Sequence, residues 1–394
     1  MNDHPLIWAE IDLNAIANNV RELRRRTRSQ AKLMAVVKAN GYGHGAAEVA
    51  RTALSNGAEW LGVARLPEAL ELREAGFDAP ILVFGYTPPA DAGRLIDYDL
   101  RQSVYSLDAA RAYSAVAEAH GRKIRVHLKV DTGMGRLGMV PAILSGEDSS
   151  HAMGEGFIRE ATAAARLPGL EPEGIFTHFA ASDSADRSYA KRQLALFIEV
   201  VSALRANGLE FDLRHAANSA AVIGIPESHL DLVRPGIALY GLRPSETVDL
   251  TGMFLKPAMA LKARIIHLKP VPAGTCISYG MTYRTPSPTV IATIPAGYAD
   301  GYRRQFSSRG LMLIHGRRVP VIGRVCMDLS MLDVGAVPEA CVEDEVVIFG
   351  RQGAESISAD DLAHELGTIN YEIVCNVTAR VPRVYLSNRS SKKE

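Results

Sequence analysis

The segment Leu33-Met34-Ala35-Val36-Val37-Lys38 is a short apolar run that ends in a lysine. Such a run is typical of a strand that is buried on both faces of a parallel sheet. Similar runs recur before residue 240, at 60–63, 81–84, 102–105, 124–130, 174–178, 213–216 and 232–234. The first two thirds of the chain therefore contain eight candidate strands at fairly regular spacing.

The segments between these runs have the pattern of amphipathic helices. Ile16, Val20 and Leu23 fall on one helical face behind Asp12, and a later helix is expected to end at Asn207-Gly208. Eight strands, each with room for a helix after it, favour a (β/α)₈ barrel over an open doubly wound sheet. We predict this barrel over residues 10–243, with a short eighth helix.

The pattern changes after Tyr240. Residues 243–251 contain Pro, Ser, Thr and Asp, which suits a linker. Beyond it, short β-type runs separated by Pro and Gly predict a mainly β C-terminal domain over 252–386. One helix is expected at 359–366. The expected strands lie at 263–268, 290–294, 311–314, 319–322 and 345–349.

Composition excludes several classes of protein. Lys plus Arg and Asp plus Glu both number 44, and this zero net charge argues against a general affinity for nucleic acid or anionic membranes. No apolar run reaches the roughly 18 residues needed to span a bilayer. The four cysteines contain no C-x-x-C pair, and the start of the chain does not resemble a secretory signal. We expect a cytoplasmic protein with reduced thiols.

Polar residues follow several of the predicted barrel strands. Because the active sites of (β/α)₈ barrels lie at the carboxyl ends of the strands, these residues should meet at one mouth. A strand can also end in charge simply because its end is solvated, but so many candidates favour a site. Lys38 leads them, since desolvation lowers the pKa of an amine and favours a Schiff base with an aldehyde. The others are Lys129, His178, Asn218, Ser219 and Arg234.

The stretch Ala35-Val36-Val37-Lys38-Ala39-Asn40-Gly41-Tyr42-Gly43-His44-Gly45 resembles the cofactor-lysine signature of the alanine racemase family. It is not a P-loop, because the lysine precedes the glycines. The resemblance runs from Trp8-Ala9-Glu10-Ile11-Asp12 to Ala379-Arg380-Val381-Pro382-Arg383. It implies a pyridoxal-phosphate-dependent racemase, built as a barrel and a β domain, that works as a head-to-tail homodimer. Residues 140–157 depart from the family pattern, and we predict a surface insertion there.

The resemblance implies two catalytic bases. Lys38 would bind pyridoxal phosphate and act on one face of the substrate, and Tyr279, supplied by the partner subunit, would act on the other. Racemisation needs two faces, because the Cα proton leaves one and returns to the other. A free tyrosine has a pKa of about 10 and is a poor base at neutral pH. His178 resembles the family histidine that hydrogen-bonds this tyrosine. Without the motif, Tyr279 would be read as an interface tyrosine of the β domain.

Arg234, in Arg234-Pro235-Gly236, resembles the family arginine that faces the pyridine nitrogen of the cofactor. Many other pyridoxal-phosphate enzymes place a carboxylate there, which keeps the ring protonated and makes it a strong electron sink. An arginine stays charged and donates to an unprotonated nitrogen. The weaker sink should favour rapid reprotonation, and therefore racemisation over transamination.

The loops after the seventh and eighth strands are where barrels commonly bind phosphate. Ser219 is predicted to cap a short helix there, although a plain cap without a ligand is equally compatible with the sequence. Backbone amides of Gly236 and Ile237 are expected to add donors there, and the resemblance adds the hydroxyl groups of Tyr42 and Tyr371. The implied cofactor ligands are Tyr42, Asn218, Ser219, Gly236, Ile237 and Tyr371, besides Lys38 and Arg234.

The substrate side of the site is also implied by resemblance. Arg136 matches the arginine near the phenolic oxygen of the cofactor and the substrate carboxylate. Lys129 matches a lysine that is often carbamylated, and a negative charge there would hold Arg136 in place, whereas two bare cations would repel. The substrate residues implied from the partner are Tyr298, Cys326, Met327 and Asp328. A nucleophilic role for Cys326 is disfavoured, since no histidine lies nearby, and we predict no metal.

Two other functions fit the same architecture less well. A pyridoxal-phosphate decarboxylase would be expected to carry a carboxylate in place of Arg234, and a non-catalytic carrier would not need Tyr279. Alanine is the implied substrate, with D-alanine supplied for peptidoglycan. A serine racemase or a broader substrate range stays open, because one methylene changes binding by only about 1–3 kcal/mol.

Overall fold

The computed structural model describes residues 5–141 and 155–387. The chain forms two compact units. The first, here called the barrel unit, contains residues 15–41 and 46–256. The second, here called the β unit, contains the N-terminal segment to residue 14, residues 42–45 and the chain from 257 onward. Most of the predicted insertion at 140–157 and nearly all of the polar tail lie outside the described residues.

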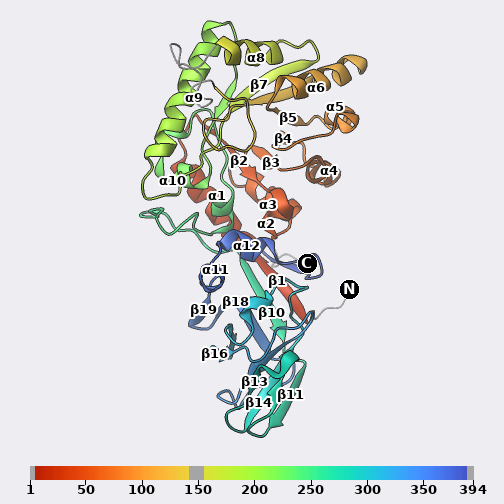
Figure 1. Ribbon diagram of the computed structural model, residues 1–394, viewed down its shortest axis with the longest axis vertical. Helices are drawn as coiled ribbons and strands as arrows, with labels where there is room; N and C mark the ends of the chain where they lie inside the picture. Colours follow the sequence, from red (N-terminus) through yellow and green to blue (C-terminus); the bar gives the residue numbers. More distant parts are fainter. Residues whose placement is uncertain (1–4, 142–154, 388–394) are drawn as a thin grey trace, which may run out of the picture. The chain divides into compact units, whose positions relative to one another are not determined.

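Eight parallel strands form a nearly closed barrel in the barrel unit (Figure 1). Their order around the barrel is β8-β7-β6-β5-β4-β3-β2-β9. Backbone hydrogen bonds from Asp231 to Arg214 and from Arg234 to Ala217 link the two ends of this series. The strands are β2 (Lys32–Val36), β3 (Trp60–Val63), β4 (Ile81–Val83), β5 (Arg101–Val104), β6 (Ile124–Lys129), β7 (Leu170–Phe176), β8 (Leu213–His215) and β9 (Leu232–Val233). The predicted (β/α)₈ class is confirmed.

Helices occupy the connections between these strands. In α1 (Leu13–Arg26) the predicted apolar face of Ile16, Val20 and Leu23 is fully buried. The others are α3 (Ala46–Leu54), α4 (Leu66–Glu74), α5 (Gly93–Asp97), α6 (Leu107–Ala119), α8 (Glu155–Ala165), α9 (Ser188–Ala206) and α10 (Ser219–Gly224), with 3-10 turns η1 (Pro89–Asp91), η2 (Pro226–Ser228) and η3 (Ile237–Tyr240). Within the described ranges, no helix combines the length and the apolar character needed to cross a membrane.

The barrel interior has an apolar side and a polar side. Side chains from β2, β3, β4, β8 and β9 form a buried cluster of Met34, Trp60, Leu82, Leu213 and Leu232. Strands β5 to β8 contribute buried polar groups to the same interior, among them Arg101, His127 and His215. Burying such groups is costly unless they are hydrogen-bonded, so these residues should form a connected network.

The β unit is mainly β, as predicted. Its largest sheet has the order β16-β15-β18-β10-β1-β20, with β19 paired to β18. Those strands are β1 (Ile7–Asp12), β10 (Met259–Arg264), β15 (Leu311–Ile314), β16 (Arg317–Pro320), β18 (Glu345–Gln352), β19 (Glu355–Ile357) and β20 (Arg383–Leu386). Two smaller sheets contain β11 (His267–Val271), β14 (Thr289–Ile294) and β17 (Ser330–Asp333), and β12 (Cys276–Ile277) with β13 (Tyr283–Arg284).

Helix α11 (Ala359–Leu366) lies where a helix was predicted, and α12 (Asn370–Cys375) follows it. The single strand expected at 263–268 was wrong. The structure has β10 and β11 there, separated at Ile265-Ile266, where the sequence offers no Gly or Pro to mark the break.

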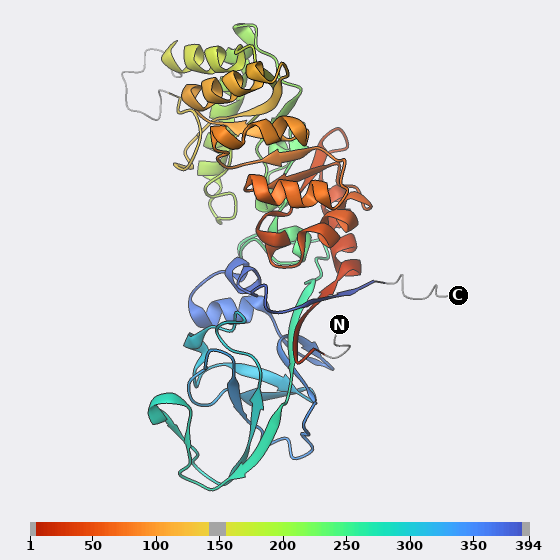
Figure 2. The same cartoon turned by 90° about the vertical axis from the view of Figure 1, so that its right-hand side faces the viewer.

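Strand β1 lies between strands from the far end of the chain. It pairs antiparallel with β10 and parallel with β20, so that Ala9 lies beside Leu261 on one side and Arg383 on the other. Figure 2 shows this first strand and the last strand lying against each other near the chain ends. This strand at 7–12 was not identified from the sequence. The domain limits of 10–243 and 252–386 remain predictions.

Candidate active site

The predicted site residues of the barrel unit lie at the carboxyl ends of its strands. Lys38 follows β2, and Lys129 is the last residue of β6. His178 lies two residues beyond β7, and Arg234 directly follows β9. Because the strands are parallel, these ends share one mouth of the barrel. The barrel rule therefore places these cationic and imidazole groups at one end.

Lys38 begins a left-handed turn labelled α2 (Lys38–Tyr42). Ala39 and Asn40 have φ values of 53° and 52°, and Gly41 and Tyr42 continue the turn at 61° and 51°. For residues other than glycine this conformation costs roughly 1–2 kcal/mol each. Strain of this kind persists only where surrounding contacts hold it, and it occurs often at functional sites.

Two side chains that the sequence analysis did not single out hold this turn. Oε1 of Glu68 accepts the amide of Ala39 at 2.6 Å, while its Oε2 accepts the amides of Ala64 and Arg65. Asn40 accepts the amide of Ala46 at 2.9 Å, at the start of α3. Glu68 lies at the third position of α4, where a glutamate often forms a capping box, so its anchoring role could have been anticipated.

Lys129 is almost fully buried and lies in a cationic environment. Burial, followed by the charges of Arg136, Arg234 and Lys38, lowers the pKa of its ammonium to about 8, while Asp131 opposes the shift. The Lys129 ammonium also lies over the ring of Phe176, at 5.4 Å from the centroid. Because a sizeable fraction of the Lys129 amine is neutral near neutral pH, this lysine is readily modified.

The loop that carries Arg136 is organised by Asp131, another residue that the sequence analysis missed. Its Oδ1 accepts the amides of Gly133, Met134 and Gly135 at 2.8–3.1 Å, and its Oδ2 accepts the amide of Arg136 at 3.1 Å. Burial alone would raise the pKa of this carboxyl, but the four N–H groups hold it below its ordinary value. The Asp-Thr-Gly-Met-Gly sequence is typical of such a side-chain-stabilised turn.

His178 is half-buried beside several cations. Burial, followed by the charges of Arg234, Arg136, Lys129 and Lys38, lowers the pKa of its imidazole well below the ordinary value, so the ring is neutral. Nη2 of Arg234 donates weakly to its Nδ1 at 3.4 Å. Gln193 of α9 donates to the carbonyl of His178 at 3.2 Å and thereby fixes its backbone.

Arg234 is buried, with 4% of its surface exposed. Burial lowers the pKa of its guanidinium to about 9, and Arg136 contributes. Its Nη1 lies 2.8 Å from Nδ1 of His215, and its Nη2 donates to the carbonyl oxygens of Thr177 and Ala216. The guanidinium is therefore held in one orientation by groups from β7 and β8.

The prediction that Ser219 caps a helix was wrong. The N-cap of α10 is Asn218, whose side chain accepts the amide of Ala221 at 3.1 Å. The Ser219 hydroxyl instead accepts the amides of Gly236 and Ala238, at 2.8 and 3.3 Å. Ser219 thus joins the loop after β8 to the segment after β9, where η3 begins at Ile237.

Tyr279 and the substrate residues predicted in the β unit lie on loops at its surface. Tyr279 is 71% exposed and Met327 is 53% exposed. Tyr298 donates its amide to the carbonyl of Cys326, and Ser278 contacts the thiol of Cys326 at 3.4 Å, so these loops adjoin. The Asp328 carboxylate accepts Nη2 of Arg380 at 2.8 Å.

Tyr42 and Tyr371 are neighbours in the β unit. Their ring centroids lie 6.1 Å apart. Burial, with a smaller contribution from Tyr371, raises the pKa of Tyr42, so its hydroxyl stays protonated and can act as a hydrogen-bond donor. A donor hydroxyl is the property that the predicted phosphate contact requires.

The residues at the barrel mouth fit pyridoxal phosphate. An amine that can bond to an aldehyde is present in Lys38, and Arg234 is a fixed donor suited to a pyridine nitrogen. The surrounding cations lower one another's pKa, as at Lys129, and would be stabilised by an anionic ligand. Over residues 5–141 and 155–387, no group of three or more His, Cys, Asp or Glu side chains is arranged for a metal.

Comparison with known families accounts for nearly the whole chain. The sequence profile described as "Alanine racemase, N-terminal domain" matches residues 11–244. The profile described as "Alanine racemase, C-terminal domain" matches residues 258–385.

Individual relatives are similar over their full length. An alanine racemase of Desulfosudis oleivorans is 54% identical over 391 residues, which are 99% of this chain and 99% of that protein. An alanine racemase of Desulforamulus reducens is 52% identical over 96% of this chain and 99% of its own length. Among solved structures, alanine racemase from Streptomyces lavendulae matches with a TM-score of 0.89 and 41% identity, covering 98% of both chains. That from Bacillus anthracis with bound L-Ala-P has a TM-score of 0.89 and 38% identity, over 98% of this chain and 97% of that chain.

Proposed function

This chain belongs to the alanine racemase family, and we propose that it interconverts L-alanine and D-alanine with pyridoxal phosphate by a two-base mechanism. We propose that it does so in the cytoplasm, where D-alanine is needed for peptidoglycan. Membership of the family makes it a pyridoxal-phosphate-dependent isomerase. The roles of individual residues and the dimer are our proposals.

The observation that carries the reaction type is the burial of Arg234 at the barrel mouth. When bound, pyridoxal phosphate would stabilise the negative charge that develops at Cα of the substrate. Arg234 is oriented by His215 and by carbonyl oxygens of Thr177 and Ala216, and none of these groups is an acid. A decarboxylase of the same fold would be expected to place a carboxylate at this position.

The two bases of the proposal are Lys38 and Tyr279 of the partner subunit. One removes the Cα proton from one face of alanine and the other delivers a proton to the opposite face, and the reverse reaction exchanges their tasks. Exposure of the loop that carries Tyr279 supports a partner-supplied role, because an exposed tyrosine beside other exposed apolar side chains suits an interface. The proposed assembly is a homodimer with shared sites.

His178 would help Tyr279 of the partner subunit to act as a base. Because Arg234 donates to Nδ1 of the neutral His178 ring, the hydrogen of that ring lies on Nε2. An Nε2 hydrogen donated to a phenol oxygen stabilises the deprotonated tyrosine. The low pKa of His178 suits this task, since a neutral ring keeps a single, oriented donor.

Arg136 would bind the substrate carboxylate, and a carbamate on Lys129 would hold Arg136. The Lys129 amine would attack carbon dioxide, forming a C–N bond and releasing one proton. Its pKa of about 8 supports this reaction, because only the neutral amine reacts. Native mass spectrometry should show one carbamate per chain. An unmodified Lys129 paired with an acidic side chain would contradict the assignment.

The experiment that tests the proposed function follows D-alanine formed from L-alanine by the pure protein with pyridoxal phosphate. Racemisation should bring the two isomers to equal concentrations. Release of carbon dioxide would indicate a decarboxylase, and binding of the cofactor without any product would indicate a carrier. A panel of amino acids ranked by kcat/KM checks the substrate, and serine outperforming alanine would overturn the choice of alanine.

A further inference from the structure

A chain of buried hydrogen bonds runs inside the barrel from Arg234 to Glu173. Nη1 of Arg234 lies 2.8 Å from Nδ1 of His215, and Nε2 of His215 lies 2.7 Å from Nδ1 of His127. Nε2 of His127 lies 3.2 Å from Oε2 of Glu173. Both imidazole rings are completely buried. This hydrogen-bond chain therefore leads from the carboxyl ends of the strands into the barrel interior. The proposed two-base reaction does not use His127 or Glu173.

The chemistry of its two ends fixes the direction of every hydrogen bond in this chain. An arginine can only donate, so Nδ1 of His215 must accept and the hydrogen of that ring lies on Nε2. Nδ1 of His127 must then accept from His215, which leaves its own hydrogen on Nε2. That hydrogen is donated to the carboxylate of Glu173, which can only accept. Each histidine is thus a neutral ring that passes polarisation from the acid towards the arginine.

Arg234 needs such a partner because it is a buried cation. Among the described residues, its polar contacts are with His215, His178 and the carbonyl oxygens of Thr177 and Ala216, and none of them carries a negative charge. A buried charge without a counter-ion is strongly unfavourable. Glu173 is the acid to which its contacts lead. Burial would raise the pKa of this carboxyl, but His127 and Arg101 hold it below its ordinary value, so it is ionised.

The barrel is shaped to hold the His127 ring in this chain. A side chain at Gly174 of β7 would place its Cβ only 2.5 Å from Nδ1 of His127, so the ring occupies the space that this glycine leaves. The pairing of β6 and β7 also shifts register between Val126 and His127. Phe176 stacks on His215 with its ring plane tilted by 1° and its centroid at 4.8 Å. These features fix both rings without any contribution from a ligand.

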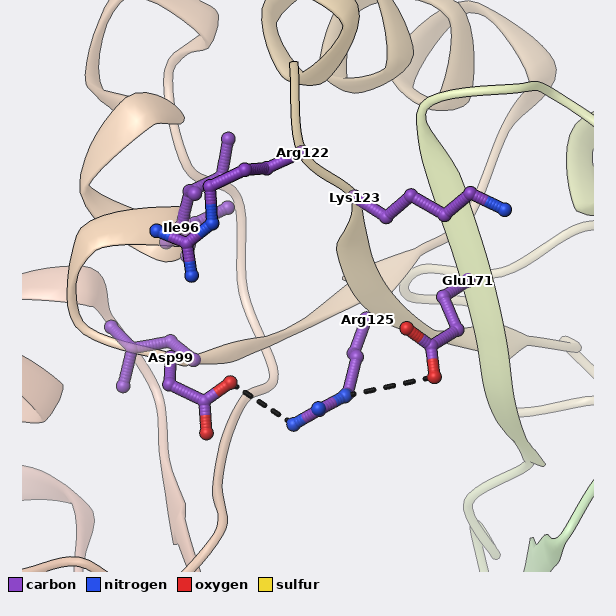
Figure 3. A pocket seen from close by; sticks show the side chains of 8 residues that line it. Ile96, Asp99, Arg122, Lys123, Arg125 and Glu171 are labelled. Carbon is purple, nitrogen blue, oxygen red and sulfur yellow. Dashed lines mark hydrogen bonds and ion pairs between the residues drawn. The ribbon is translucent and has the colours of Figure 1, made fainter. Parts of the chain in front are cut away.

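The outer end of the chain lies at the amino ends of the strands. Arg101 donates from Nε to Glu173 at 3.2 Å and from Nη1 to Asp99 at 2.9 Å. Asp99 and Glu171 flank Arg125 at a cavity of about 300 Å³, as Figure 3 shows. Glu173 is thus supported by its ion pair with Arg101, which also pairs with the half-exposed Asp99, so its charge is less costly than that of an isolated buried acid.

We propose that Glu173 is the counter-ion of Arg234, acting through His127 and His215, and that this chain positions the guanidinium and keeps it charged at the barrel mouth. His127 and Glu173 are positioning residues in this scheme, since they touch neither substrate nor cofactor. The link between Arg234 and the reaction rests on the proposed function. The protonation pattern of the two histidines does not rest on the proposed function, because it is a property of the protein alone.

The first test measures the protonation pattern by ¹⁵N NMR of the full-length protein labelled at histidine, with and without bound pyridoxal phosphate. Signals are assigned by comparison with His127→Gln and His215→Gln. Both rings should carry hydrogen on Nε2 and an unprotonated Nδ1 in each state. A doubly protonated ring, or hydrogen on Nδ1 of either histidine, overturns the proposal. An inactive wild-type protein would refute the proposed function and would leave this readout unaffected.

The second test separates charge from hydrogen bonding at the outer end. Glu173→Gln keeps an oxygen that can accept from His127 but removes the charge, and should lower kcat/KM about tenfold while shifting the ring-nitrogen resonances of His215. Glu173→Asp keeps the charge and should recover most of both. Glu171→Gln is the matched control on the same strand, because Glu171 pairs with Arg125 and is not part of the hydrogen-bond chain from Arg234 to Glu173. It should change neither readout. A silent Glu173→Gln, or an equal effect of Glu171→Gln, contradicts the proposal.

Discussion

The barrel mouth and the loops around Tyr279 in the β unit hold their side chains in opposite ways. At the mouth, Arg234 and Lys129 are almost fully buried, and the turn after Lys38 is held in a strained conformation. On the loops, Tyr279 and Met327 are exposed. The barrel mouth is thus preorganised by buried contacts, whereas the loops of the β unit present exposed side chains. This difference is what the proposed shared site requires, in which the barrel mouth is completed by Tyr279 of the partner subunit.

The largest expected effect comes from mixing two inactive variants. Lys38→Ala and Tyr279→Phe should each lose on the order of 100- to 10,000-fold in kcat, because each removes one of two bases. When equal amounts are refolded together, half of the dimers are mixed and each holds one intact site. About a quarter of the wild-type activity should therefore return if the dimer is two-fold symmetric and shares its sites.

The control pairs Lys38→Ala with His178→Phe. Both changes fall on the barrel side of the same site, so no combination of these chains contains an intact site and no activity should return. Recovery of activity with this control pair would contradict the proposal that the barrel mouth and Tyr279 of one site come from different subunits. Absence of recovery when Lys38→Ala is mixed with Tyr279→Phe would contradict it as well.

A smaller effect should follow from loosening the Arg136 loop. Asp131→Ala removes the acceptor of four backbone amides and should lower the free energy of unfolding by about 2–3 kcal/mol and kcat/KM by about tenfold. Since the pKa of Asp131 is lowered in the folded state, its stabilisation is present at neutral pH and is lost as the pH falls through that lowered pKa. Denaturant unfolding should therefore show the difference from wild type shrinking in acid.

Asp249→Ala is the matched control for the loop. Asp249 also accepts hydrogen bonds from its own turn, through Thr251, but it is exposed. The Asp249→Ala variant should leave kcat/KM unchanged. A similar loss of activity in both variants would show that Asp131 has no special function in holding Arg136.

The smallest expected effect concerns the strained turn after Lys38. Ala39→Gly removes the penalty of a left-handed alanine and should stabilise the protein by up to about 1 kcal/mol, after the extra freedom of the unfolded chain is deducted. Ala115→Gly, on the exposed face of α6, should instead destabilise by about 1 kcal/mol. Thermal unfolding measures both. Loss of stability in both variants would argue against strain at Ala39.

The sequence predicts the barrel well because its strands are buried on both faces and form nearly continuous apolar runs. It predicts β1 poorly, since the partners of Ala9 lie near residues 261 and 383 and no local pattern reports a pairing over that distance. The site residues at strand ends follow from the barrel rule alone. Tyr279 follows only from the resemblance.

The hydrogen-bond chain inside the barrel could not be predicted from the sequence. His127 lies in a segment whose apolar neighbours identify a buried strand, and nothing nearby points to His215 or Glu173 on other strands. Such contacts arise only when strands separated along the chain are closed into a barrel. The turn at Asp131 differs, because its partners are the next few residues, and closer attention to its turn chemistry would have identified it.

The position of β1 between β10 and β20 has a consequence for how the protein forms in the cell. Residues 7–12 are synthesised long before their antiparallel partners at 259–263, and longer still before their parallel partners at 383–386. The strands and helices of the barrel unit are complete long before then and can assemble during synthesis. Strand β1 can pair with β10 once residues 259–263 have been made, but its other edge stays open to other chains until β20 has been synthesised. Loss of β20 would therefore leave β1 with an open edge, so the pairing of Arg383–Leu386 with β1 protects the protein from edge-to-edge aggregation.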